Sequence, residues 1–577
     1  MKRYILPAIT LAITIAQTSA QNYSKDVDVT IELQPEVRAA SRLDISPATT
    51  TKTFPTSTLQ YNGMVVSSAV TPMISFLPAV STDSVFHPYE YRGYLTAGYF
   101  PAADFGVSAG YNIVKKPLTR FNIYAQLDRN SYKQPLSLEP DAQRSRLSAT
   151  DFDLGLNFSH ATRAGVLSAA TSLYLSHFNY PDGKMQPSTQ NIARYMLDAR
   201  WRSTLDETAS GYTISAGLDY FGYGKACFPT AFDTSTITGS RPLRELSGSV
   251  GASGQFMITH SFGIGLNASF SGASLNATYL YMPGKNSFHS DGALRRGVIS
   301  LGAYLRFNMS NFSGHIGPIF DIGTGSHNTT HVGARGVLNW NISPYMLLFG
   351  TLESGTQLNN LGYLYAISRH AAPLSTATPA FLEGDLKGGL SIGPFKGFSL
   401  TAAAGYSSAA NYALPGITDD VYTFATCNLS SVYYSVKLQY TNGKRFSATA
   451  TLEGALSNTV NHAYYKWTDR ARQVLGVNLK WRPIDPLIIE GGYDLRLKRK
   501  ICNLITLHDN IEQPNDTEYH LTELGRINCG HISVNYAFNT TFGIFARIDG
   551  IGQKQYLLAS GLPGQRLRGL AGFSLNF

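Results

Sequence analysis

Cysteine and charge are both scarce in this chain of 577 residues. It contains 4 cysteines, and Asp, Glu, Lys and Arg together make up 15% of the residues. The cysteines are scattered, at Cys227, Cys427, Cys502 and Cys529, and none of them forms a C-x-x-C pair. This spacing argues against a disulfide scaffold and against a cysteine-rich zinc site. A bridge between Cys502 and Cys529 at the base of one predicted loop stays open, because spacing alone does not give its geometry.

Long apolar runs are also absent beyond the start of the chain. Lys2 and Arg3 precede the apolar segment 5–16, and the small residues Thr18-Ser19-Ala20 follow it. This pattern predicts a secretory signal peptide over residues 1–20, with cleavage after Ala20. The longest uncharged stretch, 53–82, is interrupted by prolines and is therefore expected to be extended or looped. An exported chain without a spanning helix can cross a membrane only as a closed barrel.

What the chain does have is alternation, which is strictest at its C-terminus. Apolar residues occupy one face of the last segment, at Ala571, Phe573, Leu575 and Phe577, and Gly572, Ser574 and Asn576 fall on the other. Because side chains alternate across a strand, this predicts a barrel strand between lipid and a wet lumen. The segment resembles the C-terminal targeting strand of Gram-negative outer-membrane barrels. The resemblance implies that the four apolar residues form a signal read by the barrel assembly machinery.

The same period of two recurs along the chain. Apolar residues alternate with small or polar ones over 121–127, 152–158, 262–270 and 542–548. Short turns are expected near 160–162, 309–311, 342–344, 442–444, 483–486 and 539–541. Long links are expected near 133–146, 179–190, 224–242, 274–296, 358–380, 408–430, 458–469, 500–525 and 551–565. We therefore predict an all-β fold, a large transmembrane antiparallel β-barrel of about 20–22 strands over residues 91–577, with the long links outside the cell.

A barrel of this size is too wide for its own wall side chains to fill. In architecture it resembles the TonB-dependent receptors of the outer membrane, whose barrels carry an N-terminal plug. Residues 21–90 are shorter than such a plug, so we expect a short periplasmic or plug-like segment there. Within it, Val27, Val29, Ile31 and Leu33 form another alternating run. This run is either a strand tucked into the barrel mouth or a strand that pairs with a periplasmic partner.

One basic run stands out before the long link 500–525. If the strand continues, Arg496, Lys498 and Lys500 share one face, which predicts a basic lumen stripe that steers anions near the outer mouth. Arg499 would then point outward, toward the phosphates of lipopolysaccharide. The alternative is charge balance against the acidic link that follows, which we expect to be a solvated loop rather than a metal site.

Motifs for chemistry are missing. The sequence has no G-x-S-x-G elbow, no H-E-x-x-H and no phosphate-binding glycine loop, so we predict no enzyme activity, no cofactor and no metal site. No basic and aromatic patch suggests nucleic acid. We expect an outer-membrane protein in contact with lipid and lipopolysaccharide. The resemblance implies a transport or receptor protein for an unknown solute, with TonB-type or lipoprotein partners. The alternative is a non-transporting barrel that scaffolds an assembly or secretion complex.

Overall fold

A computed structural model describes most of residues 91–577. The ranges left out within that span are 101–103, 140, 204–209, 231–240, 277–279, 283–286, 290–292, 326–328, 373–378, 419–420, 444, 461–462, 466–471, 507–516 and 560–561. The predicted signal peptide, the segment 21–90 and its run from Val27 to Leu33 lie outside the described residues. No helix among the described residues is both long enough and apolar enough to cross a bilayer.

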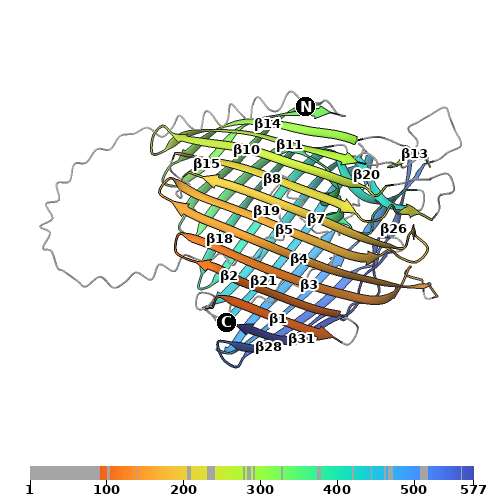
Figure 1. The fold of residues 1–577 in the computed structure, drawn as a ribbon. Coiled ribbons are helices and arrows are strands. Elements are labelled where there is room, and N and C mark those ends of the chain that lie inside the picture. Colours follow the sequence, from red (N-terminus) through yellow and green to blue (C-terminus); the bar gives the residue numbers. More distant parts are fainter. Residues whose placement is uncertain are drawn as a thin grey trace, which may run out of the picture. The chain divides into compact units, whose positions relative to one another are not determined.

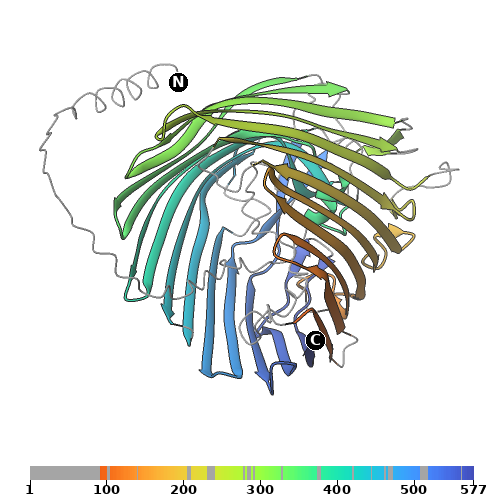
Figure 2. The same ribbon diagram turned by 60° about the vertical axis from the view of Figure 1, so that its left-hand side comes forward.

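The described chain folds into a closed antiparallel barrel of 22 strands, as the sequence predicts (Figures 1 and 2). The wall strands are β1 (Gly93–Phe100), β2 (Asp104–Lys115), β3 (Thr119–Pro135), β4 (Arg144–Thr162), β5 (Gly165–Asn179), β7 (Thr189–Arg202), β8 (Gly211–Tyr223), β10 (Arg244–Met257), β11 (Phe262–Asn276), β14 (Ala293–Asn308), β15 (Phe312–Gly325), β16 (Thr330–Ser343), β17 (Met346–Gln357), β18 (Ala380–Phe395), β19 (Phe398–Thr418), β20 (Val421–Asn442), β21 (Phe446–Val460), β23 (Gln473–Ile484), β24 (Leu487–Leu497), β27 (Ile527–Ala537), β28 (Phe542–Ile551) and β31 (Arg568–Asn576).

Shorter elements lie in the links between wall strands. They are β6 (Met185–Gln186), β9 (Phe228–Pro229), β12 (Leu280–Met282), β13 (Ser287–His289), α2 (Leu361–Ile367), β22 (Ala463–Tyr465), β25 (Lys500–Thr506), β26 (Thr517–Glu523), β29 (Leu557–Ala559) and β30 (Leu562–Pro563). All of them fall in links at one end of the barrel, the end opposite to the short turns. One of them, β25, pairs in parallel with the tip of β19, where Ile417 lies opposite Asn503.

The barrel closes where its two ends meet. β1 pairs with β31 in antiparallel register, with Tyr94 opposite Asn576 and Tyr99 opposite Ala571. Beyond the paired residues, the amide of Phe577 donates to the carbonyl of Gly93 at 3.0 Å. The Phe577 ring stacks on the ring of Tyr111 on β2, with centroids 6.3 Å apart. The last residue of the chain thus helps to hold the seam together.

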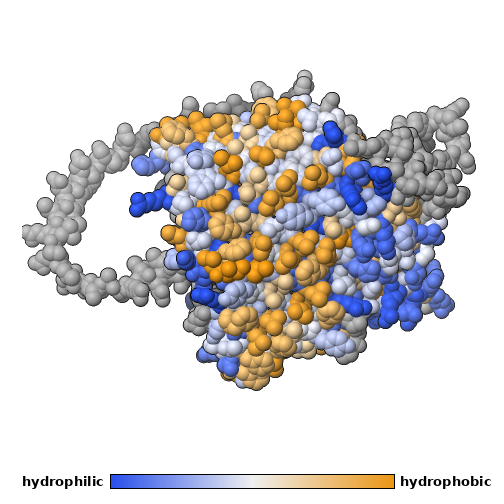
Figure 3. All heavy atoms as spheres, in the orientation of Figure 1, coloured by the Kyte–Doolittle hydropathy of each residue, from blue (hydrophilic) through white to orange (hydrophobic). Residues whose placement is uncertain are grey.

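The outer face of the wall is apolar because the alternation places one set of side chains there. Phe262, Ile264, Leu266 and Phe270 on β11 are 43–62% exposed, whereas Gly263 and Gly265 between them face inward and are buried. Orange residues cover much of the wall in Figure 3, and blue residues gather toward the strand ends. A soluble protein rarely exposes so large an apolar surface, and a bilayer would cover it.

Aromatic rings gather next to the short turns. The rings of Phe307 and Phe312 stack across one turn at 4.9 Å, and those of Phe398 and Tyr440 lie 4.3 Å apart beside another. Trp340 and Trp481 are each 50% exposed on the same rim. Such a girdle marks the membrane interface of a barrel, where amphipathic rings are most stable.

The predicted turns mostly coincide with the observed ones, but one predicted link is wrong. Residues 408–430 do not form a loop, because β19 and β20 continue as a paired ribbon to Thr418 and Val421. Pro415 and Gly416 have a low preference for strands, yet Pro415 lies within the ladder, opposite Phe424. Pairing with a long partner strand outweighs the local preference of these two residues.

Candidate functional site

The most distinctive feature inside the barrel is the link between β17 and β18. We call its residues 358–372 the strap. The strap includes α2, whose first turn is capped by Asn360: the Asn360 side chain accepts a hydrogen bond from the amide of Tyr363 at 2.8 Å. Gly362 allows the helix to lie against the wall, because a Cβ there would stand 3.1 Å from the guanidinium carbon of Arg194 on β7.

The start of the strap is held by a buried ion pair of the wall. Arg296 on β14 donates to a Glu245 oxygen on β10 at 2.5 Å, and the two side chains are 0% and 2% exposed. The other Glu245 oxygen accepts the amide hydrogen of Leu361, and Arg296 also donates to the carbonyl of Asn359 at 3.1 Å. Glu245 faces the lumen, since its neighbour Leu246 is 53% exposed on the outer face.

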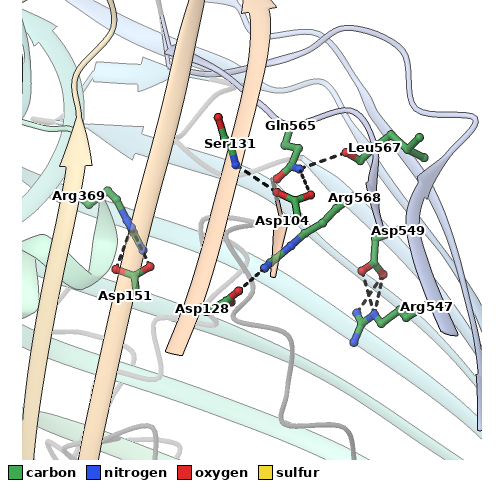
Figure 4. Close-up of polar contacts among 10 residues, drawn as sticks. All are labelled: Asp104, Asp128, Ser131, Asp151, Arg369, Arg547, Asp549, Gln565, Leu567 and Arg568. Carbon is green, nitrogen blue, oxygen red and sulfur yellow. Dashed lines mark hydrogen bonds and ion pairs between the residues drawn. The ribbon is translucent and has the colours of Figure 1, made fainter. Parts of the chain in front are cut away.

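The end of the strap reaches a different part of the wall. Arg369 donates to both carboxylate oxygens of Asp151 on β4, at 3.2 and 3.1 Å (Figure 4). In the wall, β5, β7, β8, β10, β11, β14, β15 and β16 lie between β4 and β17. The strap therefore leaves the wall after β17 and contacts β14, β10, β7 and β8 on the lumen side before it reaches β4.

The strap then returns to β18 along the tips of β19 and β20. The amide of Ala372 donates to the carbonyl of Tyr422 at 2.8 Å, and the Thr423 hydroxyl donates to the carbonyl of Ala372 at 3.0 Å. The Asn359 side chain donates to the carbonyl of Asn411 on β19 at 3.4 Å. Hydrogen bonds thus fix both ends of the strap at the rim that carries the long links.

Aromatic side chains fill the space between the strap and the wall. Tyr365 packs against Phe221 of β8 at 5.3 Å and against Phe178 of β5 at 6.2 Å, measured between ring centroids. His370 stands edge-on to Phe178 at 5.4 Å. Burial and the neighbouring Arg369 lower the pKa of His370 to about 3. The docked strap therefore contains a neutral histidine at physiological pH.

A second group of links packs beside the strap. We call Arg499 with residues 524–526, 552–559 and 562–567 the loop cover. Leu524, Leu557 and Leu562 form a buried cluster with Leu147 on the lumen face of β4. The Tyr132 hydroxyl on β3 donates to the carbonyl of Pro563 at 3.2 Å. Tyr422 packs against this cluster and also against the strap cluster of Leu364 and Ala371, so the two assemblies adjoin.

The predicted basic stripe is wrong in part. Arg496 lies on β24, facing the lumen, but the strand ends at Leu497, and Lys498 adopts a left-handed backbone with φ 54°. The alternation therefore does not continue to Lys500, which begins β25 and whose side chain lies outside the described residues.

Arg499 also departs from expectation, because it does not point outward to lipopolysaccharide. Its guanidinium donates to the carbonyl of Leu557 at 2.9 Å and lies 5.8 Å from the centroid of the Tyr556 ring. Burial lowers the pKa of Arg499 to about 10, and burial raises the pKa of Tyr556 to about 12.

The residues of the predicted assembly signal lie on the face that was predicted. Ala571, Phe573 and Phe577 are exposed on the outer wall and Leu575 is half-buried, while Ser574 and Asn576 are buried on the lumen side. Whether the assembly machinery reads them stays a prediction. Cys227 and Cys529 carry free thiols, so the bridge between Cys502 and Cys529 is not formed.

Below the strap the lumen wall carries acidic and small side chains. A shallow groove there is lined by Met196, Asp198, Gly217, Asp219, Ser247, Ser249, Ser271 and Leu358, among others. Asp219 is paired with Arg194 at 2.7 Å. Within the described residues, Asp153 and Asp198 form no ion pair, and no group of three or more His, Cys, Asp and Glu side chains is placed to hold a metal ion.

A second set of wall charges lies at the seam. Arg568 on β31 donates to Asp128 on β3 at 2.7 Å, and Asp104 on β2 accepts the amide hydrogen of Ser131 at 3.1 Å (Figure 4). Gln565 of the loop cover donates to Asp104 at 3.3 Å. These bonds tie β31 and the cover to β2 and β3 on the lumen side of the seam.

The sequence predicts an outer link at 358–380 but not that the link folds inward as the strap. A signal for it was present, since Leu361, Leu364, Tyr365 and Ile367 make this outer link unusually apolar behind the capping residue Asn360. An apolar helix in a loop needs a surface to cover it, and here the lumen wall provides that surface.

No protein-family model matches the sequence, and no curated protein matches it. Solved structures match the fold at low identity. The iron transporter FrpB from Neisseria meningitidis aligns over 84% of this chain and 81% of its own, with a TM-score of 0.61 and 8% identity. The ferric enterobactin receptor PfeA from Pseudomonas aeruginosa aligns over 85% and 81%, with a TM-score of 0.61 and 11% identity. The ferric-catecholate import receptor Fiu from E. coli aligns over 85% and 82%, with a TM-score of 0.56 and 9% identity. The barrel thus has the fold of TonB-dependent outer-membrane receptors.

Proposed function

We propose that this chain is an outer-membrane transport or receptor barrel whose outer mouth is closed by the strap. The observation that carries the proposal is the ion pair between Arg369 and Asp151, which holds the far end of an inward-folded link against the lumen face of β4. A wall of 22 strands encloses more space than its own side chains fill. Such a lumen has to be occluded to preserve the permeability barrier, and the strap with the loop cover occupies its outer end.

The solved neighbours support the class of activity. They are described as an iron transporter, a ferric enterobactin receptor and a ferric-catecholate import receptor. We extend to this chain the passage or capture of a solute through a gated lumen, not the identity of the solute. In this proposal residues 21–90 form a short periplasmic or plug-like segment, and Val27, Val29, Ile31 and Leu33 offer a strand to a TonB-type or lipoprotein partner.

The orientation follows from the strand ends. The chain ends on the rim of the short turns, which we place in the periplasm, and the strap and loop cover then face the outside. Epitope tags at Gly443 and within 507–516 test this orientation on intact cells. The second tag alone should be accessible to antibody. Labelling at Gly443 alone would invert the barrel. Phe577→Glu should lower the amount of assembled barrel but leave export intact.

The experiment for a gated lumen is made in cells. Replacing residues 359–371 by a short Gly/Ser linker removes the strap and leaves the wall pair of Glu245 and Arg296 intact. Cells that carry this variant should become sensitive to large hydrophilic antibiotics that the outer membrane excludes. A matched variant with the same linker in the link 231–240 should not change sensitivity. Equal sensitivity in all strains would contradict a strap-gated lumen.

The second candidate is a non-transporting scaffold, and the burial of the strap favours it. Side chains of the pair between Arg369 and Asp151 are 7% and 8% exposed, and an aromatic cluster surrounds them. If the strap never leaves the wall, the barrel passes nothing and serves as a platform. Co-purification of stoichiometric partners without measurable solute passage would establish this reading.

A further inference from the structure

The wall site that holds Arg369 is complete without the strap's backbone. Asp151 and its neighbours Tyr174, Ser176 and Phe178 come from β4 and β5 alone, and we call these four residues the Asp151 pocket. The Tyr174 hydroxyl donates to Asp151 at 2.8 Å and the Ser176 hydroxyl donates to it at 2.6 Å. These two donors stabilise the ionised carboxylate before any cation arrives.

The pocket suits a flat cation. One guanidinium nitrogen of Arg369 donates to both Asp151 oxygens, at 3.2 and 3.1 Å. The guanidinium carbon lies 6.0 Å from the centroid of the Phe178 ring and 6.0 Å from that of Tyr365. Tyr365 leaves with the strap, but Phe178 belongs to the wall and remains. A planar, weakly hydrated cation gains from the Phe178 ring face, whereas a compact ammonium is more strongly held by water.

The other anchors of the strap behave differently when the strap is removed. Glu245 and Arg296 both belong to the wall and remain paired with each other. At Ala372 the strap uses only backbone groups and the Thr423 hydroxyl, which water can replace. Asp151, by contrast, would lose the arginine that pairs with it. A buried carboxylate without its partner is costly, so release of the strap is favoured by another cation that takes its place.

Further acidic groups continue below the pocket. Asp153 follows Asp151 on the same face of β4, about 7 Å along the strand. Asp198 lies in the groove under the strap, where a Cβ at Gly217 would stand 2.9 Å from its carboxylate oxygen and 3.0 Å from the Ser249 hydroxyl. Neither Asp153 nor Asp198 forms an ion pair within the described part of the chain. A cation released from the pocket therefore meets acidic side chains further into the lumen.

We propose that the Asp151 pocket is a recognition site for a guanidinium group carried by the solute, and that Arg369 is its internal occupant. A guanidinium-bearing solute that arrives from outside competes with Arg369, takes its place against Asp151 and thereby releases the strap. This inference rests on the proposed function, because it names the chemistry that opens the gate. The site itself, however, can be tested without any transport.

The test uses the full mature chain, refolded in detergent, with Arg369→Ala to vacate the pocket. Methylguanidinium is titrated by calorimetry at constant ionic strength, with methylammonium as the matched cation. The variant should bind methylguanidinium about tenfold more tightly than methylammonium, because the planar cation packs on the Phe178 ring face and sheds its water more easily than the ammonium does. Arg369→Met fills the same space without charge and should not bind, and adding Asp151→Asn to Arg369→Ala should abolish binding.

The same titration of the wild-type chain tests whether Arg369 competes with methylguanidinium for the pocket. It should bind methylguanidinium more weakly than Arg369→Ala does, because Arg369 occupies the pocket. If Arg369→Ala does not fold, the variant with residues 359–371 replaced by a linker exposes the same pocket. A folded variant that does not bind, equal affinity for the two cations, or binding that survives Asp151→Asn would each overturn the proposal. None of these results depends on conductance or cellular location, so failure of the site is distinguishable from failure of the proposed function.

Discussion

The strap and the loop cover dock on the same strand by different means. The strap attaches to β4 through Asp151, a carboxylate that is buried, hydrogen-bonded and ion-paired. The loop cover attaches to β4 through Leu147, which packs with Leu524, Leu557 and Leu562. At β4 itself a polar contact holds the strap and apolar area holds the loop cover, although aromatic packing also holds the strap elsewhere and hydrogen bonds also hold the cover.

The difference bears on which assembly can be switched. Apolar contact is non-directional, and its strength follows the area removed from water, so no single group releases it. An ion pair is released when either partner is neutralised or replaced, and the partner left behind then favours a substitute. We infer that the strap is the movable part of the outer mouth and that the loop cover is its fixed frame.

The largest effect should come from Asp151→Ala. It leaves the Arg369 cation buried beside Phe178 without its carboxylate, which should weaken docking of the strap by about 3–5 kcal/mol. Hydrogen exchange at the amides of Leu364 and Ser368, which are bonded within the strap, should accelerate by roughly two to four orders of magnitude. The amide of Leu557 in the loop cover serves as the internal control and should not change. Equal acceleration at Leu557 would show that the two assemblies are one unit.

Leu524→Ala is the converse substitution in the loop cover. The side chain is 1% exposed, and removing it should cost about 2–4 kcal/mol because a cavity remains. Exchange at the amide of Leu557, which donates to the carbonyl of Leu524 at 2.9 Å, should accelerate, and exchange at Leu364 should not. If exchange at the strap amides accelerates as strongly, the loop cover and the strap are coupled through Tyr422, which contacts both.

Acid should loosen the strap and spare the cover. The pKa of His370 falls from 6.5 to about 3 when it is docked between Arg369, Phe178 and Tyr180. Because the docked pKa is the lower one, stabilisation by neutral His370 is full above pH 6.5 and is lost as pH falls toward 3. At pH 5 the loss should be about 2 kcal/mol. Exchange at Leu364 measured from pH 7 to pH 5, corrected for intrinsic rates, should show this loss. His370→Phe should remove it, and an unchanged profile in that variant would assign the effect to another group.

The smallest effect is expected from Arg499→Met. This change removes the hydrogen bonds to Leu557 and Gly525 and the contact with the Tyr556 ring. Docking of the loop cover should weaken by about 1–2 kcal/mol, visible as faster exchange at Leu557. The apolar cluster should keep the cover in place. Complete loss of protection at Leu557 would mean that this cover also depends on a single charged group.

The barrel could be predicted from the sequence because its signal is local. Alternation at Phe573, Leu575 and Phe577 sets which face meets lipid, and short turns such as 309–311 fix the strand ends. The length of β19 and β20 could not be predicted, because Pro415 and Gly416 are tolerated only through pairing with the partner strand. The predicted basic stripe from Arg496 to Lys500 was wrong for a related reason. The backbone of a single residue, Lys498, is left-handed and ends the alternation of side chains.

The candidate site was out of reach for a different reason. The sequence shows an outer link at 358–380, but the direction in which it folds depends on Asp151 and Glu245, which are more than 100 residues away in the chain. Contacts of such sequence separation leave no local pattern. The apolar character of α2 indicated that a covering surface exists, and the structure identifies it as the lumen wall.

We infer that removal of the strap alone opens the outer mouth and that the loop cover is the fixed frame around it. Single-channel conductance in planar bilayers tests this inference most directly. Three proteins are compared: the mature wild-type chain, the variant with residues 359–371 replaced by the linker, and the Leu524→Ala variant of the loop cover. We expect a silent or flickering wild type, large and steady openings without the strap, and wild-type behaviour for Leu524→Ala. Closed traces after removal of the strap, or steady openings from Leu524→Ala alone, would contradict it.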